Sequence, residues 1–386
     1  MKTFFCKTVL SFVGRLTVGA AFSHTAPRRS PLPLEAERGQ PLDACCNLAA
    51  HHAKPTTGAW ARWKTIRPLR SLGGRGEGQG EVRVSFTFAL MLALLTLVST
   101  AQAKLNVVAT TPDFAAIARD IGGDQIELTI LAKPTEDPHF VDAKPSFILK
   151  LNRADVLIDG GAELEAGWLP ALLDQSRNAK LASGAPGRIA GSQGIRLLEV
   201  PASLDRAKGD IHAAGNPHFL TDPVNAKIVA QHITESFCQL DPKSADSYRA
   251  NLKQFTGTID AKLAEWERTL VPFKGREVVA YHDSWLYFGE RFGLKIDLFL
   301  EPKPGIPPTP AHLAEVIAKM KADNANLIIV DPYLNRKTAE TVARNTGATV
   351  VAVTQFPGGV KGTEGGYIPM MDYLVNSMAQ ALAKTP

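Results

Sequence analysis

From Lys104 to the end of the chain, short apolar runs alternate with longer segments whose apolar residues recur at helical spacing. This repeated alternation of strand and helix is typical of an α/β fold with parallel sheets. The expected strands are 105–110, 126–131, 156–158, 277–281, 296–300, 327–330 and 349–353. The expected helices, apart from one long helix, are 112–121, 145–153, 165–177, 224–240, 285–292, 310–322, 337–345 and 370–383.

The long helix is expected to start after Asp241-Pro242 and to end near Leu270. Its apolar positions recur every three or four residues and are Tyr248, Leu252, Phe255, Ile259, Leu263, Trp266 and Leu270. At about 1.5 Å per residue, such a helix is about 40 Å long, which is the length of a small domain. We therefore predict two α/β lobes, 104–240 and 272–386, joined by a rigid linking helix, 241–271, with a cleft between the lobes.

The first hundred residues differ from the rest in charge and pattern. Residues 1–103 carry a net charge of +8, whereas the remainder carries −3, so nothing in the folded part favours nucleic acid. Arg83 is followed by an apolar stretch and then by the small-residue site Ala101-Gln102-Ala103. This layout predicts a signal peptide, 84–103, cleaved after Ala103, and therefore a periplasmic protein. A membrane anchor is the alternative, although the apolar part is short for a span of about 20 residues.

The segment that precedes the predicted signal, residues 1–83, is rich in Arg, Pro and Gly and shows no sustained periodicity. It is predicted to be disordered or non-native, with translation beginning near residues 82–91. No cysteine stands at the predicted cleavage site, so a lipid-anchored form is not expected.

Three histidines lie on separate loops, and two of them stand in the same tripeptide, Pro-His-Phe. Their contexts are Pro138-His139-Phe140, Pro217-His218-Phe219 and Tyr281-His282-Asp283. Neutral imidazole is the commonest protein ligand for zinc, and a side chain that is already positioned loses little entropy when the ion binds. In α/β sheets, ligands bind beyond the carboxyl ends of strands, and His282 follows such a strand. His212 lies in a flexible stretch, where it either collects metal or has no role.

From Lys104 onward the chain resembles the metal-binding solute-binding proteins of ABC importers for zinc and manganese. The motifs that carry the resemblance are Glu136-Asp137-Pro138-His139, the stretch from Asn216 to Pro223, and Tyr281-His282-Asp283-Ser284. The resemblance implies two lobes joined by a rigid helix, one metal in the cleft, and ligands at His139, His218 and His282. It also implies a partner, the membrane permease of an ABC transporter. We expect a monomer that catalyses no reaction.

The fourth ligand stays open at this point. Members of the family commonly supply a carboxylate from a late loop, but the matching segment here, 354–359, has no acidic residue. Asp331 at a strand end is the first candidate, Glu136 and Asp137 are weaker ones, and water is the alternative.

Ligand chemistry favours Zn²⁺ over Mn²⁺, because three nitrogen donors suit zinc whereas manganese prefers oxygen. In the family, a histidine at the third position resembles the zinc type. Copper and nickel would also bind such a site by raw affinity. Because only neutral imidazole coordinates metal, affinity is expected to fall below about pH 6.

Two other functions are compatible with the same residues. A secreted zinc hydrolase also uses three histidines and an open position, but the chain lacks a His-Glu-x-x-His motif that would supply a general base. A metal-dependent adhesin or a periplasmic metal store cannot be separated from an importer component by sequence.

Overall fold

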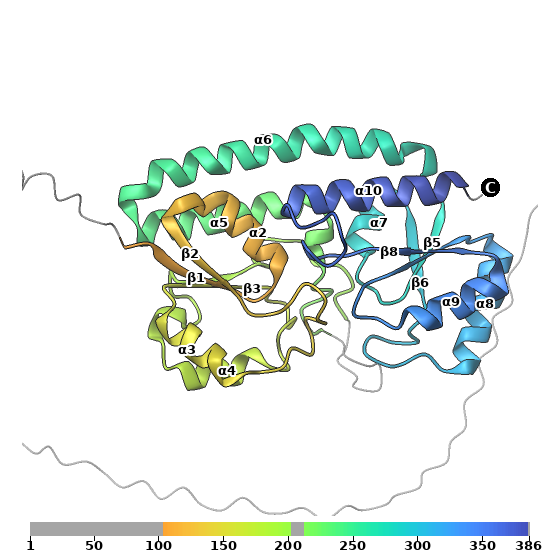
Figure 1. Cartoon of the computed structure of the whole chain (residues 1–386), viewed down its shortest axis with the longest axis horizontal. Coiled ribbons are helices and arrows are strands. Elements are labelled where there is room, and N and C mark those ends of the chain that lie inside the picture. Colours follow the sequence, from red (N-terminus) through yellow and green to blue (C-terminus); the bar gives the residue numbers. More distant parts are fainter. Residues whose placement is uncertain (1–102, 202–211, 385–386) are drawn as a thin grey trace, which may run out of the picture. The chain divides into compact units, whose positions relative to one another are not determined.

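The computed structural model describes residues 103–201 and 212–384, and this part of the chain contains two four-stranded parallel sheets (Figure 1). The first sheet has the order β2-β1-β3-β4. Its strands are β1 (Leu105–Ala109), β2 (Ile126–Ile130), β3 (Val156–Asp159) and β4 (Arg188–Ala190). Its lobe also holds α2 (Pro112–Gly122), α3 (Pro145–Arg153) and α4 (Leu169–Ser176).

The second sheet repeats this arrangement with the order β6-β5-β7-β8. Its strands are β5 (Glu277–Ala280), β6 (Lys295–Phe299), β7 (Leu327–Val330) and β8 (Thr349–Ala352). The helices of this lobe are α7 (Leu286–Phe292), α8 (Pro310–Asp323), α9 (Arg336–Thr346) and α10 (Tyr367–Lys384). Two parallel-sheet lobes confirm the predicted α/β class.

Helix α5 (Pro223–Leu240) leads into the long helix α6 (Ala245–Leu270), which runs along both lobes in Figure 1. Helix α6 contacts α5 and α2 on the first lobe and α10 on the second. All seven apolar positions expected on its inner face are buried or partly buried against the core. Helix α6 begins three residues later than Pro242. Asp241 is the C-terminal cap of α5, and Pro242–Ser244 form a short 3₁₀ turn before α6 starts.

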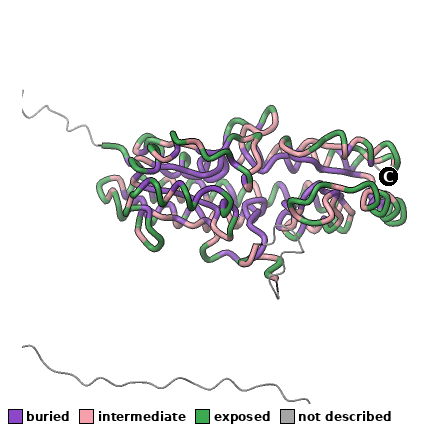
Figure 2. The backbone as a smooth tube through the Cα atoms, turned by 90° about the horizontal axis from the view of Figure 1, so that it is seen from below, coloured by how far each residue is buried: buried purple, intermediate pink, exposed green. Residues whose placement is uncertain are grey.

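Each sheet is covered on both faces, as the alternation of its side chains requires. Val107 and Ile158 of the first sheet, and Val278 and Ile329 of the second, belong to one continuous apolar core under α6. The intervening residues face two separate outer cores, one for each lobe. In Figure 2 the buried segments run through the interior of this body and exposed residues line its outside. The shared core therefore joins the two lobes through side-chain packing as well as through α6.

The structure shortens one predicted helix and contains one strand that was not predicted. A helix was expected over 165–177, but α4 begins only at Leu169, since Pro170 fits the first turn of a helix and not its interior. Ala162 and Glu163, which precede the expected start, have positive φ angles and belong to the turn that leads toward α4. Strand β4 was not predicted, because three residues are too few for a periodic pattern to be recognised.

The predicted extension 1–83, and the predicted signal peptide apart from Ala103, lie outside the described residues. Within 103–201 and 212–384, no helix combines the length and apolar character that crossing a bilayer requires.

Candidate metal centre

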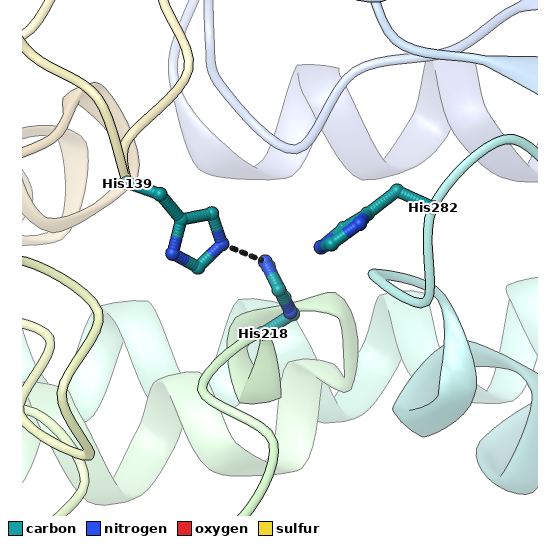
Figure 3. A group of neighbouring side chains, drawn as sticks. All are labelled: His139, His218 and His282. Carbon is teal, nitrogen blue, oxygen red and sulfur yellow. Dashed lines mark hydrogen bonds between the residues drawn. The ribbon is translucent and has the colours of Figure 1, made fainter. Parts of the chain in front are cut away.

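The three predicted histidines converge from separate segments of the chain (Figure 3). His139, His218 and His282 each offer a ring nitrogen, and these three atoms lie within 4.8 Å of one another. The Nε2 atoms of His139 and His218 are 3.2 Å apart. Two ligands on one tetrahedral ion with bonds of about 2.0–2.1 Å are separated by roughly 3.3 Å. The observed spacing therefore suits a shared ion without any rearrangement of these two rings.

His139 belongs to the loop after β2 and is held by the first lobe. Its backbone N–H donates to Asp137 Oδ1 (3.0 Å), and the carbonyl of Pro138 accepts a hydrogen bond from Trp168 Nε1 (2.9 Å). Burial, followed by the nearby His282 and His212, lowers the pKa of His139 to about 3. The ring is therefore neutral at pH 7, which is the form that coordinates a metal.

His218 lies in the connection between the lobes, and Asn216 orients it. Asn216 Oδ1 accepts from the backbone N–H of His218 (3.0 Å) and lies 3.0 Å from its Nδ1. A proton on Nδ1 satisfies this carboxamide oxygen and leaves Nε2 with a lone pair toward the other two rings. Burial first, and then the neighbouring histidines, hold the pKa of His218 well below its ordinary value.

The segment around His218 is fastened to the second lobe as well. Tyr287 Oη donates to the carbonyl of Asn216 (2.7 Å), and Tyr367 Oη donates to the carbonyl of Leu220 (2.6 Å). Arg291 forms two hydrogen bonds of 2.8 Å with the carboxylate of Asp222, which also caps α5. His218 is thus fixed to both lobes, whereas the contacts of His139 described above come from its own lobe.

His282 follows β5, and a carboxylate occupies the side of its ring that faces away from the other histidines. Its Nδ1 donates to Glu301 Oε2 (2.7 Å). Burial alone would lower the pKa of His282, but Asp283 and Glu301 outweigh it and raise that pKa to about 10. Without a metal, His282 therefore carries a positive charge at pH 7.

Glu301 was missed by the sequence analysis, although the chain contains a signal for it. It follows the predicted strand 296–300 just as His282 follows the strand 277–281. Strands β5 and β6 are parallel neighbours with Ala280 opposite Phe299, so the same register brings His282 beside Glu301. The signal is recognisable only when the pairing of these two strands is known. Asn216 and Asp283 were likewise not predicted to support or complete the site.

Asp331 is not part of the group of close metal-ligating atoms found among the described residues. Its side chain is buried at the end of β7, where Oδ2 accepts a hydrogen bond from Trp285 Nε1 (3.1 Å). Burial raises the pKa of Asp331 to about 7, although Trp285 and His282 partly oppose this. The carboxyl group is thus only partly ionised at neutral pH.

The two weaker carboxylate candidates have other partners. Glu136 Oε2 accepts from the backbone N–H of Lys133 (3.1 Å), and Asp137 supports the backbone of His139 as described above. His212 stacks on His139, with ring centroids 5.1 Å apart and planes inclined by 25°. It lies beside the site but outside the close group formed by the other three histidines.

A cavity of about 300 Å³ borders one of the three histidines, His282. His282, Asp283, Glu301, His212 and Asn216 contribute to its wall. The cavity thus reaches the site on the side of His282.

Known proteins resemble this chain over most of its described part. The family described as zinc-uptake complex component A, periplasmic (ZnuA), matches residues 107–381. The metal ABC transporter substrate-binding lipoprotein ScbA of Streptococcus cristatus is 27% identical over 293 residues, covering 74% of this chain and 91% of that protein. The manganese ABC transporter substrate-binding lipoprotein PsaA of Streptococcus anginosus is 26% identical over 294 residues, covering 74% and 92%. The iron ABC transporter substrate-binding lipoprotein MtsA of Streptococcus pyogenes serotype M1 is 26% identical over 289 residues, covering 73% and 90%.

Solved structures share the fold. A crystal structure of ZnuA has a TM-score of 0.60 and 22% identity, covering 72% of this chain and 99% of that one. The Mn-bound periplasmic metal binding protein from Candidatus Liberibacter asiaticus has a TM-score of 0.60 and 21% identity, with coverage of 72% and 99%. At identities of 21–22%, the similarity to these structures establishes a shared fold.

Proposed function

This chain belongs to the ZnuA family of periplasmic zinc-uptake components, and we propose that it captures Zn²⁺ between its lobes and delivers the ion to a membrane permease. Its general role is that of a metal-binding substrate-binding protein of an ABC transporter, and proteins of this kind bind and release their cargo without transforming it. The observation that carries the choice of zinc is the convergence of three imidazole nitrogens in one group, in which His218 and His282 are buried and His139 is partly buried. The curated relatives are named for manganese, iron or an unspecified metal, so the choice rests on the donor atoms of this chain.

Zinc should bind more tightly than manganese by at least about a hundredfold, because three nitrogen donors favour zinc and the Irving–Williams order adds to this preference. Calorimetric titration of the metal-free chain with each ion, at the same pH and ionic strength, measures the difference. Equal affinities, or tighter binding of manganese, would contradict the proposed cargo.

The affinity for zinc should rise with pH across the neutral range, with about one proton released for each ion bound. His139 and His218 are already neutral at pH 7, but His282 has a pKa near 10 without metal and must lose its proton to coordinate. The apparent Kd should therefore fall about tenfold for each unit of pH between 6 and 8. The sequence alone predicts a decline only below about pH 6, since it does not reveal the carboxylates beside His282.

Titrations in two buffers with different heats of ionisation count the protons directly. The observed heat should differ between the buffers by the heat of ionising about one buffer molecule per zinc bound. The same heat in both buffers would show that no imidazole loses a proton when zinc binds.

We further propose that cargo exchange uses local loop movements rather than wide opening of the lobes. The support is the length of α6, its contacts with α2 and α10, and the apolar core that is continuous beneath it. The loop that carries His139 is the part expected to move, because the segment of His218 is hydrogen-bonded to the second lobe through Tyr287 and Tyr367.

We also propose that the chain is exported as a monomer and that its signal ends near Ala103. The family is described as periplasmic, and the relatives named above are lipoproteins of importers. The mass of the mature chain purified from the cell tests where the signal ends. A mature chain that retains residues 1–83 would contradict the proposed end near Ala103.

A further inference from the structure

His282 stands between two carboxylates, one near each of its ring nitrogens. Glu301 accepts from Nδ1 (2.7 Å), so the proton on Nδ1 is fixed and Nε2 is the nitrogen that faces the other histidines. This is the outer carboxylate that commonly orients a metal-bound imidazole. Glu301 therefore lies on the Nδ1 side of the ring, whereas the second carboxylate, that of Asp283, lies on the Nε2 side.

Asp283 Oδ1 is 3.0 Å from Nε2 of His282. Even so, Nε2 is buried and has no hydrogen-bond partner among the described residues. The oxygen thus lies beside the ring nitrogen instead of along its N–H axis. Two neighbouring ligand atoms on one tetrahedral zinc ion are about 3.3 Å apart, which is close to the distance between Nε2 and Oδ1.

The backbone of Asp283 is held beside the segment that carries His218. Its backbone carbonyl accepts from Asn216 Nδ2 (2.9 Å), which belongs to the residue that orients His218. Asn216 thereby links the backbone of Asp283 to His218.

The side chain of Asp283 has space to turn. It is 16% exposed and contributes to the wall of the cavity of about 300 Å³ beside the site. Its oxygens lie outside the close group of three ring nitrogens, so a change in its side-chain torsions is needed to reach the ion. Asp331, in contrast, is only 2% exposed, and its Oδ2 accepts a hydrogen bond from Trp285 while its Oδ1 is buried without a hydrogen-bond partner among the described residues.

We propose that Asp283 supplies the fourth ligand of the zinc site, as an oxygen donor beside the nitrogens of His139, His218 and His282. The assignment rests on the proposed function, since it concerns the same bound ion. It replaces the late-loop carboxylate that this chain lacks with one adjacent in sequence to a histidine ligand. The site then has three nitrogens and one oxygen, and it holds the ion without a bound water.

The decisive experiment is a zinc-bound crystal structure of the wild-type chain, accompanied by calorimetry of Asp283→Asn and Asp331→Asn. In the crystal, an oxygen of Asp283 is expected at about 2.0–2.2 Å from zinc. Asp283→Asn should weaken zinc binding by at least about tenfold, because the amide oxygen is neutral and a poorer donor. Asp331→Asn is the matched control and should change the Kd by less than about threefold, while Asp283→Glu should recover part of the lost affinity.

A water molecule or Asp331 in the fourth position of the wild-type crystal would overturn the assignment, whatever the variants do. Unchanged zinc affinity in a folded Asp283→Asn chain would overturn it as well. If Asp283→Asn does not fold, the wild-type crystal alone decides. Failure of the proposed function has a different signature, since the wild-type chain itself would then bind no zinc at micromolar concentration.

Discussion

Replacing His218 with alanine is expected to weaken zinc binding by at least about a hundredfold, since removing even an outer partner of a ligand commonly costs 10–100-fold. The change removes one of three ring nitrogens that lie within 4.8 Å of one another. His218 is also the proposed ligand whose loop is fixed to both lobes through Tyr287 and Tyr367. No other histidine of the described residues belongs to this close group, although His212 stacks on His139. A competition titration against a chelator of known zinc affinity measures the loss.

His232→Ala is the matched control for this prediction. His232 lies on α5, outside the close group, so its loss should leave the Kd for zinc unchanged within about twofold. His139→Ala and His282→Ala should resemble His218→Ala, because all three nitrogens face one position. A variant of any of the three that folds and still binds zinc as tightly as the wild type would contradict the three-histidine site.

Replacing Trp266 with alanine is expected to lower the free energy of unfolding by about 3–5 kcal/mol. Trp266 is the largest side chain that α6 inserts into the core, and it is only 1% exposed. Its Nε1 donates to Asp372 of α10 (2.8 Å), so the residue fastens the long helix to the second lobe. Urea-induced unfolding followed by circular dichroism measures the change, which should appear as a lower midpoint of the transition.

Trp266→Phe separates packing from hydrogen bonding at the same position. It keeps an aromatic ring but loses the N–H group, so it should cost only about 1–2 kcal/mol. Asp372 is left with Lys262 as a partner, since the two charged groups are 2.9 Å apart. A loss of less than about 1 kcal/mol in Trp266→Ala would mean that α6 is not held to the second lobe by this contact.

Much of the fold was predictable because its signals are local. The strand 327–330 and the helix 145–153 have the predicted bounds, since an apolar run bounded by polar residues and a proline in the first turn are both visible in a short window. The inner face of α6 was predictable for the same reason, because helical periodicity is strong over 26 residues. The start of α4 and the three-residue strand β4 escaped prediction, since a backbone turn and a partner strand decide them.

The site, like the fold, was predictable only where the signal comes from neighbouring residues. The sequence by itself determined which imidazoles are restricted, since proline and an aromatic residue flank His139 and His218, and it determined that His282 follows a buried strand. Those are properties of neighbouring residues. It did not reveal that the ring of His282 lies between Glu301 and Asp283, or that Asp331 accepts a hydrogen bond from Trp285.

Only the tertiary structure decided which carboxylate stands beside which nitrogen. The pairing of β5 with β6 brings His282 to Glu301, and the folding of the connection between the lobes brings Asn216 to Asp283. The physical reason is that coordination and hydrogen bonding act over about 2–3 Å, whereas a sequence pattern specifies which element a residue belongs to and which face it occupies. Separations of that size between distant segments are set by strand register and core packing, which no single segment contains.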